Sequence, residues 1–227
     1  MSMMTVQGAD AQLNTLKVDF YLDLICPWCW IGLRNLRSAW QVMQQEQPGL
    51  KLQVQWHADT LLPQIPPQGI DYQSFYVARL GSPAAVDARR AQVRAAAQAV
   101  GLTLNFEAIA LFPNSRLACA LVNLAQDELA GDAMFDFVQT VFTAYFQQGR
   151  DIGDVQVLMD LAQGAGLSVE VAQLNNPAAA RSLGHAGGVP HYVFNQRETE
   201  TGAVPAEHLL RLMRAAAAQQ TDMAFHD

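Results

Sequence analysis

The 227-residue sequence predicts an α/β fold in which a helical domain interrupts a β-sheet. Apolar residues alternate with a period of two at residues 16–24 and 50–56, and a helical spacing separates these two segments. Helical signals then continue until a second β pattern begins near residue 189. The length itself is that of one large domain, or of one domain with a sizeable insertion.

The first half of the sheet is predicted from the start of the alternating pattern. Every second residue from Leu16 to Leu24 is apolar, which indicates a strand with one buried face. From Pro27 the apolar residues recur at steps of three and four until Pro48-Gly49 ends the helix. A strand, a helix and a second strand of these lengths form a βαβ unit, so we expect the two strands to be parallel.

The middle of the chain is predicted to be helical. The proline-rich segment 62–67 marks a domain edge, and Ser82-Pro83 is typical of an N-cap followed by a proline in the first turn. Gly101 ends that helix. Further helices are expected around residues 117–124, around residues 135–146, and from Asp154 to about Gly164.

The β pattern returns at residues 189–194 and continues in a polar strand at 197–201, after which Gly202 leads into a last amphipathic helix. A βαβ half, a helical interruption and a ββα half, in this order, predict a thioredoxin-like fold with an inserted α-helical domain. We assign residues 14–64 and 183–220 to a discontinuous thioredoxin-like domain and residues 65–182 to the α-helical insertion.

Composition and charge exclude several classes of protein. Charged residues make up 15% of the chain, against about 25% in typical soluble domains, and hydrophobic residues make up 51%, which excludes a disordered chain. A net charge of −7 offers no broad basic face to nucleic acid or to an anionic membrane, so neither is expected as a partner. The sequence has no apolar run long enough to span a membrane and no signal-peptide pattern, so we expect a cytoplasmic protein. Its oligomeric state is left open.

The motif Cys26-Pro27-Trp28-Cys29 lies where the first strand gives way to a helix. The free backbone N–H groups and the dipole of a helix N-terminus stabilise a thiolate at Cys26. The spacing brings Cys29 within disulfide reach, which predicts an exposed nucleophile at Cys26 and a buried resolving thiol at Cys29. Half of a zinc site is the alternative interpretation, but Cys119 and the histidines are scattered singly, so we expect no metal.

The motif Gly187-Gly188-Val189-Pro190 directly precedes the second β pattern. Proline cannot donate a hydrogen bond to a neighbouring strand, so it fits the start of a strand, and we expect a cis Val189–Pro190 bond that lies against the dithiol and excludes metal. An extended substrate would then pair with Val189 as an added strand. Val189 and Pro190 are therefore candidates for substrate binding, together with Trp28, which we expect to be exposed beside the dithiol.

Five segments resemble a known family: DLICPWCWIG at 23–32, PNSRLA at 113–118, FTAYFQQGRDI at 142–152, GVP at 188–190 and TGA at 201–203. With them the chain resembles the DsbA-like thiol-disulfide oxidoreductases, and within these the FrnE-like branch, over about residues 16–215. The resemblance implies a thioredoxin fold with a helical insertion, Cys26 as the attacking thiol, Cys29 as the resolving thiol and Pro190 as the cis-proline.

The sequence departs from the family pattern at three places. The segment from Gly166 to Pro190 is shorter than the family leads us to expect, which bears on the shape of the substrate groove. Cys119 stands where the family often has histidine, and a glycine is inserted within residues 185–188.

Three residues are candidates for auxiliary roles. Asp23 ends the first strand, where it is placed to assist proton transfer from Cys29, although a solvated carboxylate is the commoner explanation. Asn114 matches a family motif that tends to face the active site, and it is also an ordinary helix cap. Cys119 is interpreted either as an auxiliary thiol at the rim of the dithiol groove or as a small buried hydrophobe. Four arginines are interpreted as a solvated helix face rather than an anion site: Arg79, Arg89, Arg90 and Arg94.

The sequence thus predicts a cytoplasmic dithiol-disulfide oxidoreductase that acts on protein or small-molecule disulfides without a metal or an organic cofactor, with glutathione considered as a co-substrate. The related kappa-class glutathione transferases and 2-hydroxychromene-2-carboxylate isomerases are the alternative, but that branch typically has serine at the position of Cys26. A non-catalytic module that holds apolar peptides beside Trp28 is the second alternative.

Overall fold

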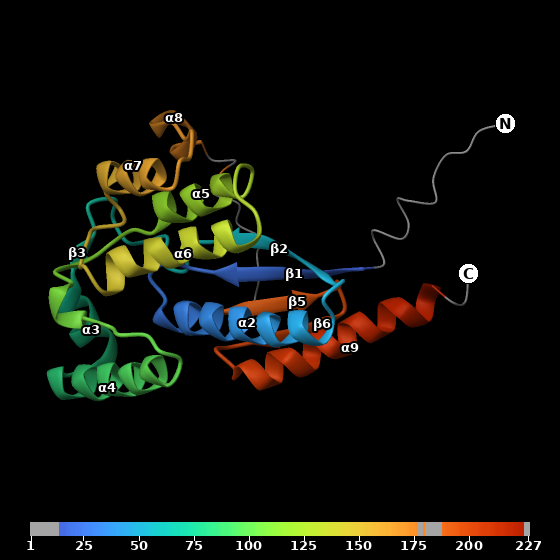
Figure 1. Ribbon diagram of the computed structural model, residues 1–227. Helices are drawn as coiled ribbons and strands as arrows, with labels where there is room; N and C mark the ends of the chain where they lie inside the picture. The colour runs from blue at the N-terminus through green and yellow to red at the C-terminus, as the bar shows by residue number, and fades with distance from the viewer. Residues whose placement is uncertain (1–13, 177–178, 180–187, 225–227) are drawn as a thin grey trace.

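The computed structural model describes residues 14–176, 179 and 188–224, the last five of these without their side chains. A four-stranded mixed sheet has the order β2-β1-β5-β6, in which β1 and β2 are parallel and the other neighbours are antiparallel (Figure 1). The elements of this half are β1 (Thr15–Leu22), α2 (Pro27–Glu46), β2 (Lys51–Ala58), β5 (His191–Phe194), β6 (Glu198–Thr201) and α9 (Ala206–Ala224). The predicted α/β class and thioredoxin-like arrangement are confirmed.

One face of the sheet carries the core. The alternate residues of β1 from Leu16 to Leu22 are buried, as the period of two predicts. Phe20 stacks on Tyr192 and meets the edge of Trp56, so an aromatic row crosses three strands. Figure 1 shows α2 and α9 side by side along the sheet.

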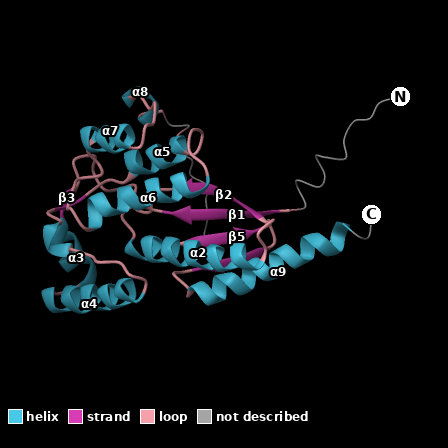
Figure 2. Ribbon diagram, viewed as in Figure 1, coloured by secondary structure: helices cyan, strands magenta, loops and turns pink. Residues whose placement is uncertain are grey.

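The inserted elements form two groups around this half. The helices α3 and α4 lie together at one end of the molecule, while α5, α7 and α8 lie on the other side of α6 (Figures 1 and 2). The ring of Trp30 in α2 stacks on Phe142 in α6, which joins the insertion to the sheet half. The bounds are β3 (Ile70–Asp71), α3 (Tyr72–Leu80), α4 (Pro83–Ala99), the 3₁₀ helix η1 (Phe106–Ala108), β4 (Leu111–Phe112), α5 (Arg116–Ala125), α6 (Gly131–Phe146), α7 (Val155–Gly164) and α8 (Val171–Leu174).

The predicted helix starts are confirmed by their caps. The Ser82 side chain accepts a hydrogen bond from the backbone N–H of Ala85, and Asp154 accepts one from Gln156. Five elements were not predicted, namely α3, η1, α8 and the two short antiparallel strands β3 and β4. The predicted domain boundaries stay a prediction, and the boundary at residues 182 and 183 lies outside the described residues.

Two side-chain amides of α5 and its C-terminus cover part of the edge of β2. The Asn123 amide accepts a hydrogen bond from the N–H of Ala58 and donates one to its carbonyl, at 3.0 and 2.9 Å. Gln126 makes the same pair of bonds with Trp56, both at 3.1 Å. These amides form hydrogen bonds with backbone groups that would otherwise be unpaired at an edge strand.

None of the described helices is both long and apolar enough to cross a membrane.

Candidate active site

The two cysteines of the motif occupy the first turn of α2. Cys26 is its N-cap residue, with extended backbone angles (φ −97°, ψ 109°), and Pro27 follows in the first turn, where a missing N–H is harmless. The N–H of Cys26 donates to the carbonyl of Asp23 at 3.1 Å, and the carbonyl of Cys26 accepts from the N–H of Cys29 at 3.0 Å. These two hydrogen bonds fix the turn that links β1 to α2.

The two thiols differ in their exposure. Both cysteines are free; Cys26 is partly exposed and Cys29 is fully buried. Burial raises the pKa of Cys29 well above its usual value, and the hydrogen bond and charge of Cys26 raise it further. The arrangement therefore has one thiol within reach of a substrate and a second thiol that stays protonated behind it.

Pro190 packs against the turn of α2 that follows the dithiol. The Val189–Pro190 peptide bond is cis, in agreement with the sequence prediction. A methyl group on Gly32 of α2 would lie 2.9 Å from Cγ of Pro190 and 2.2 Å from the hydroxyl of Tyr192, so only glycine permits this approach. Burial raises the pKa of Tyr192 well above its usual value, and the charges of the two thiols add to that effect. The start of β5 thus lies beside the first two turns of α2.

Asp23 is buried, which corrects the interpretation of a solvated carboxylate. Its side chain has no exposed surface and accepts hydrogen bonds from the backbone N–H groups of Leu61, at 2.8 Å, and Ile25, at 3.2 Å. Burial raises the pKa of Asp23 to about 6, although these hydrogen bonds act in the opposite direction. The same carboxylate charge contributes to the raised pKa of Cys29. Asp23 is therefore a buried group that titrates near pH 6, and its charge acts on the resolving thiol.

Cys119 lies behind Asp23 rather than at the rim of a groove. It is 1% exposed, and its Sγ donates to Oδ1 of Asp23 at a distance of 3.7 Å. Burial raises its pKa well above the usual value, and the charge of Asp23 adds to this effect. Of the two interpretations, the rim thiol is wrong and the buried side chain is right, with the addition of a polar contact that the sequence did not predict.

Asn114 lies directly before Ser115, the N-cap residue of α5, and has structural partners. Its Oδ1 accepts a hydrogen bond from the N–H of Arg116 at the start of α5, and its Nδ2 donates to the carbonyl of Ile65. Both side-chain atoms are thus engaged in holding the chain segments before α3 and α5 together. The N-cap position of α5 belongs to Ser115, whose side chain makes no capping bond, while Asn114 satisfies the N–H of the first helical residue.

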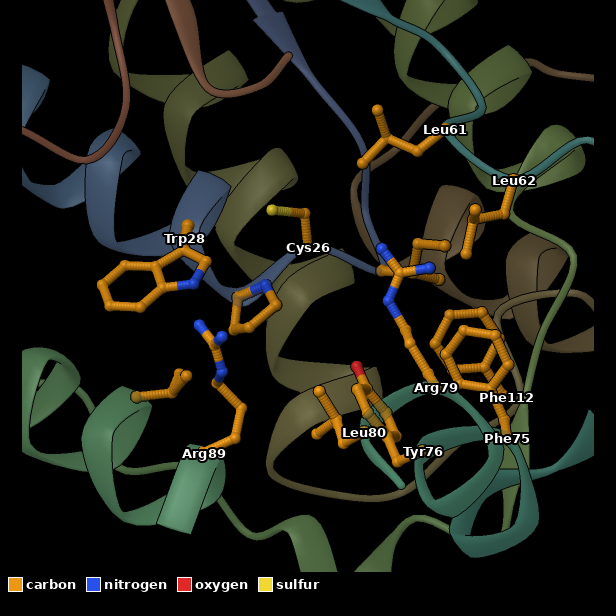
Figure 3. Close-up of a pocket in the computed structure, with 13 residues that line it drawn as sticks. Cys26, Trp28, Leu61, Leu62, Phe75, Tyr76, Arg79, Leu80, Arg89 and Phe112 are labelled. Atoms are coloured by element: carbon orange, nitrogen blue, oxygen red, sulfur yellow. The ribbon is translucent and has the colours of Figure 1, made fainter. Parts of the chain in front are cut away.

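A cavity of about 420 Å³ opens beside Cys26. Figure 3 shows that its walls come from four parts of the chain: the turn that carries the dithiol motif, the loop after β2, the helices α3 and α4, and the strand β4. Trp28 lines one side, as expected for a residue beside the dithiol, whereas Val189 and Pro190 do not line this cavity. The rings of Phe75 and Phe112 stack at 3.9 Å on the opposite side.

Two of the four arginines that were expected on a solvated helix face lie at this cavity. Arg79 of α3 and Arg89 of α4 line it, although both are exposed. Arg90 lies over the ring of Tyr72 and donates to Gln73, and Arg94 pairs with Glu107. The four arginines thus fall into two that face the dithiol and two with structural partners.

Tyr76 is a site residue that the sequence did not reveal. In Figure 3 its hydroxyl points from α3 toward Cys26. Burial raises the pKa of Tyr76, and the charge of Cys26 raises it further. An aromatic pair four residues apart, Tyr72 and Tyr76, was the available signal, but α3 itself was not predicted.

Among the described residues, no group of three or more His, Cys, Asp or Glu side chains is placed to hold a metal ion.

The fold and the site together define a thioredoxin-fold protein with a two-cysteine centre at the N-terminus of its first described helix. The family model described as a DSBA-like thioredoxin domain matches residues 17–214. The chain therefore belongs to the DsbA-like thioredoxin-domain family.

Individual proteins agree with this assignment. The uncharacterised protein YwbO of Bacillus subtilis (strain 168) is 25% identical over 153 residues, which cover 67% of this chain and 68% of YwbO. The crystal structure of a probable DsbA oxidoreductase from Streptomyces coelicolor has a TM-score of 0.75 at 24% identity, covering 88% of this chain and 89% of that one. The cytosolic disulfide reductase DsbM from Pseudomonas aeruginosa, in a structure with GSH, has a TM-score of 0.54 at 18% identity, covering 92% and 98%. These two structures show that the fold is shared.

Proposed function

We propose that this protein is a cytoplasmic dithiol-disulfide oxidoreductase of the FrnE-like branch, with Cys26 as the nucleophile and Cys29 as the resolving thiol. The observation that carries the proposal is the difference between the two thiols, since a partly exposed Cys26 lies at a helix N-terminus and a fully buried Cys29 lies behind it. The cytosolic disulfide reductase of similar fold supports the location.

The proposed reaction has two steps. The thiolate of Cys26 attacks one sulfur of a substrate disulfide, which forms a mixed disulfide and releases the other substrate sulfur as a thiolate. Cys29 then loses its proton and attacks Sγ of Cys26, so the second substrate thiol leaves and the Cys26–Cys29 disulfide remains. Two electrons pass from the dithiol to the substrate.

Asp23 is proposed as the acceptor of the Cys29 proton. The second step needs a base, because burial opposes ionisation of Cys29. Asp23 is buried in the same region. Because its pKa is about 6, the Asp23 carboxyl group is ionised in most molecules at neutral pH. A base of this kind takes the proton as the thiol attacks, without requiring a free Cys29 thiolate beforehand.

Substrate contact is proposed for Trp28, Val189 and Pro190. Trp28 lines the cavity beside Cys26 and offers an apolar surface. Val189 is half-buried two residues before β5, and we propose that its backbone pairs with an extended substrate. Disulfides of proteins and of small molecules are both compatible with these contacts. Glutathione is proposed as a co-substrate because a protein of similar fold has been crystallised with GSH.

The proposal is tested by replacing Cys29 with Ser. The variant keeps the nucleophile and lacks the resolving thiol, so incubation with glutathione disulfide is expected to leave a stable adduct on Cys26, which peptide mass spectrometry locates. A Cys26→Ser variant is the control and is expected to form no adduct at the motif. If Cys29→Ser remains unmodified under conditions that modify free cysteine, the proposed nucleophile is wrong.

The same pair of variants separates the alternatives. A peptide-binding module would hold an apolar peptide equally well with and without Cys26. A transferase or isomerase would act on a non-disulfide substrate and would not need Cys29. Loss of disulfide reduction in both variants, with unchanged folding, is the result expected for a dithiol mechanism.

A further inference from the structure

The cavity beside Cys26 has the dimensions of a small-molecule site. Its volume of about 420 Å³ lies within the usual range of roughly 300–1,000 Å³ for ligand pockets. The helices α3 and α4 bound it on the side opposite the dithiol turn (Figure 3). A disulfide that reacts with Cys26 therefore has part of its structure enclosed between this turn and the insertion.

The charge of the cavity is positive in a chain that is acidic overall. The lining residues include Arg79 and Arg89 and no aspartate or glutamate, although the net charge of the protein is −7. Among the described residues, no carboxylate lies within ion-pair distance of either guanidinium, whereas the neighbouring Arg94 is paired with Glu107. Two arginines without a carboxylate partner at a cavity are suited to bind an anionic group, because the guanidinium group matches a carboxylate in shape and charge.

The two arginines are directed at the reacting thiol from different helices. In Figure 3, the side chains of Arg79, from α3, and Arg89, from α4, both extend toward the turn that holds Cys26 and Trp28. The side chain of Tyr76 lies between them. A ligand whose sulfur meets Cys26 thus has a cationic group on either side and aromatic rings beneath it.

We propose that this cavity selects low-molecular-weight disulfides that carry carboxylate groups, with Arg79 and Arg89 as the residues that determine this specificity. The inference rests on the proposed function and names its substrate class. The arginines bind the carboxylates, and the stacked rings of Phe75 and Phe112 contact the carbon chain between carboxylate and sulfur. The reaction is the exchange described above: the Cys26 thiolate displaces one carboxylate-bearing thiolate and retains the other as a mixed disulfide.

The test measures the first step alone, in full-length protein that also carries Cys29→Ser. Rates of adduct formation on Cys26 are compared for three disulfides of different charge, namely 3,3′-dithiodipropionate, bis(2-hydroxyethyl) disulfide and cystamine. Arg79 and Arg89 are replaced together by Gln. The control replaces Lys51 and Arg211 by Gln, which removes the same charge from exposed positions on β2 and α9 that have no carboxylate partner among the described residues.

The expected result is a loss of about tenfold or more in the rate with dithiodipropionate at low salt, as for removal of charged hydrogen bonds. The rate with the neutral disulfide should stay within about twofold and the rate with cystamine should rise, since like charges no longer repel. The control variant should retain the rates of the parent. Because each comparison is a ratio of variant to parent, differences in the intrinsic reactivity of the disulfides cancel.

The outcomes distinguish this inference from the proposed function. If the parent reacts with none of the three disulfides, the proposed function fails. If the parent reacts with them and the cavity variant slows all three equally, or none, the proposed specificity is overturned while the thiol chemistry stands. Far-UV circular dichroism reports the folding of each variant, and the two single substitutions replace the double variant if its spectrum differs from that of the parent.

Discussion

Replacing Asp23 by Asn is expected to remove a pH dependence from the stability of the reduced protein. In the native state the pKa of Asp23 is about 6, because the carboxyl is buried, and in the unfolded chain it returns to about 3.8. The native state therefore retains the proton more tightly than the unfolded state, and ionisation at neutral pH opposes folding. Asn does not ionise, and its Nδ2 cannot accept one of the hydrogen bonds that the two carboxyl oxygens receive from Leu61 and Ile25, so the substitution also has a cost that is nearly the same at every pH.

The sign and size of the effect follow from proton linkage. Between about pH 4 and pH 6 the native protein binds more protons at Asp23 than the unfolded chain does, so its free energy of unfolding falls as the pH rises. The difference between the two pKa values corresponds to about 3 kcal/mol. Asp23→Asn lacks this dependence, so its free energy of unfolding relative to that of the wild type is expected to rise by about 3 kcal/mol between pH 3.5 and pH 7.

The assay is urea unfolding of reduced protein, followed by tryptophan fluorescence from pH 3.5 to 8. The exposed Asp127 provides a matched control, and Asp127→Asn should follow the wild-type profile at every pH. Parallel profiles for Asp23→Asn and the wild type would refute the argument that burial raises the proton affinity of this carboxyl. The same variant should also slow the resolving step at neutral pH, since the proposed proton acceptor is lost.

Two further substitutions test the packing around the site. Gly32→Ala should lower the free energy of unfolding by about 1–3 kcal/mol, as calorimetry or urea unfolding can show, because the new methyl group would meet Tyr192. Gly164→Ala has open space around it and should not destabilise the protein, which makes it the matched control. Asn123→Ala should cost about 2–4 kcal/mol, since the N–H and carbonyl of Ala58 lose their partners; unchanged stability would contradict that role.

The dithiol could be placed from sequence because its signals are local. The alternating pattern that ends before Cys26 and the helical spacing that begins at Pro27 define a strand-to-helix junction without any distant contact. In the same way Ser82 and Asp154 cap the starts of their helices through hydrogen bonds to residues close by in the chain. Such features depend on short segments, and the structure confirms them.

The features that escaped prediction depend on distant residues. Asp23 is buried with a hydrogen bond from Leu61, 38 residues away in the chain. Arg79 and Arg89 face Cys26 because α3 and α4 pack at the end of the dithiol turn, and no local pattern encodes that arrangement. The nine-residue helix α3 was missed because only Tyr72 of its residues is fully buried, so its sequence has no clear apolar stripe.

The amides that cover β2 also limit which parts of this protein can be removed. A shortened chain with only the sheet, α2 and α9 would resemble a minimal thioredoxin fold, but it would lack Asn123 and Gln126. The backbone groups of Trp56 and Ala58 would then be free to pair with a strand of another molecule. The insertion therefore prevents intermolecular strand pairing and also lines the cavity. A chain from which the insertion has been removed is expected to aggregate.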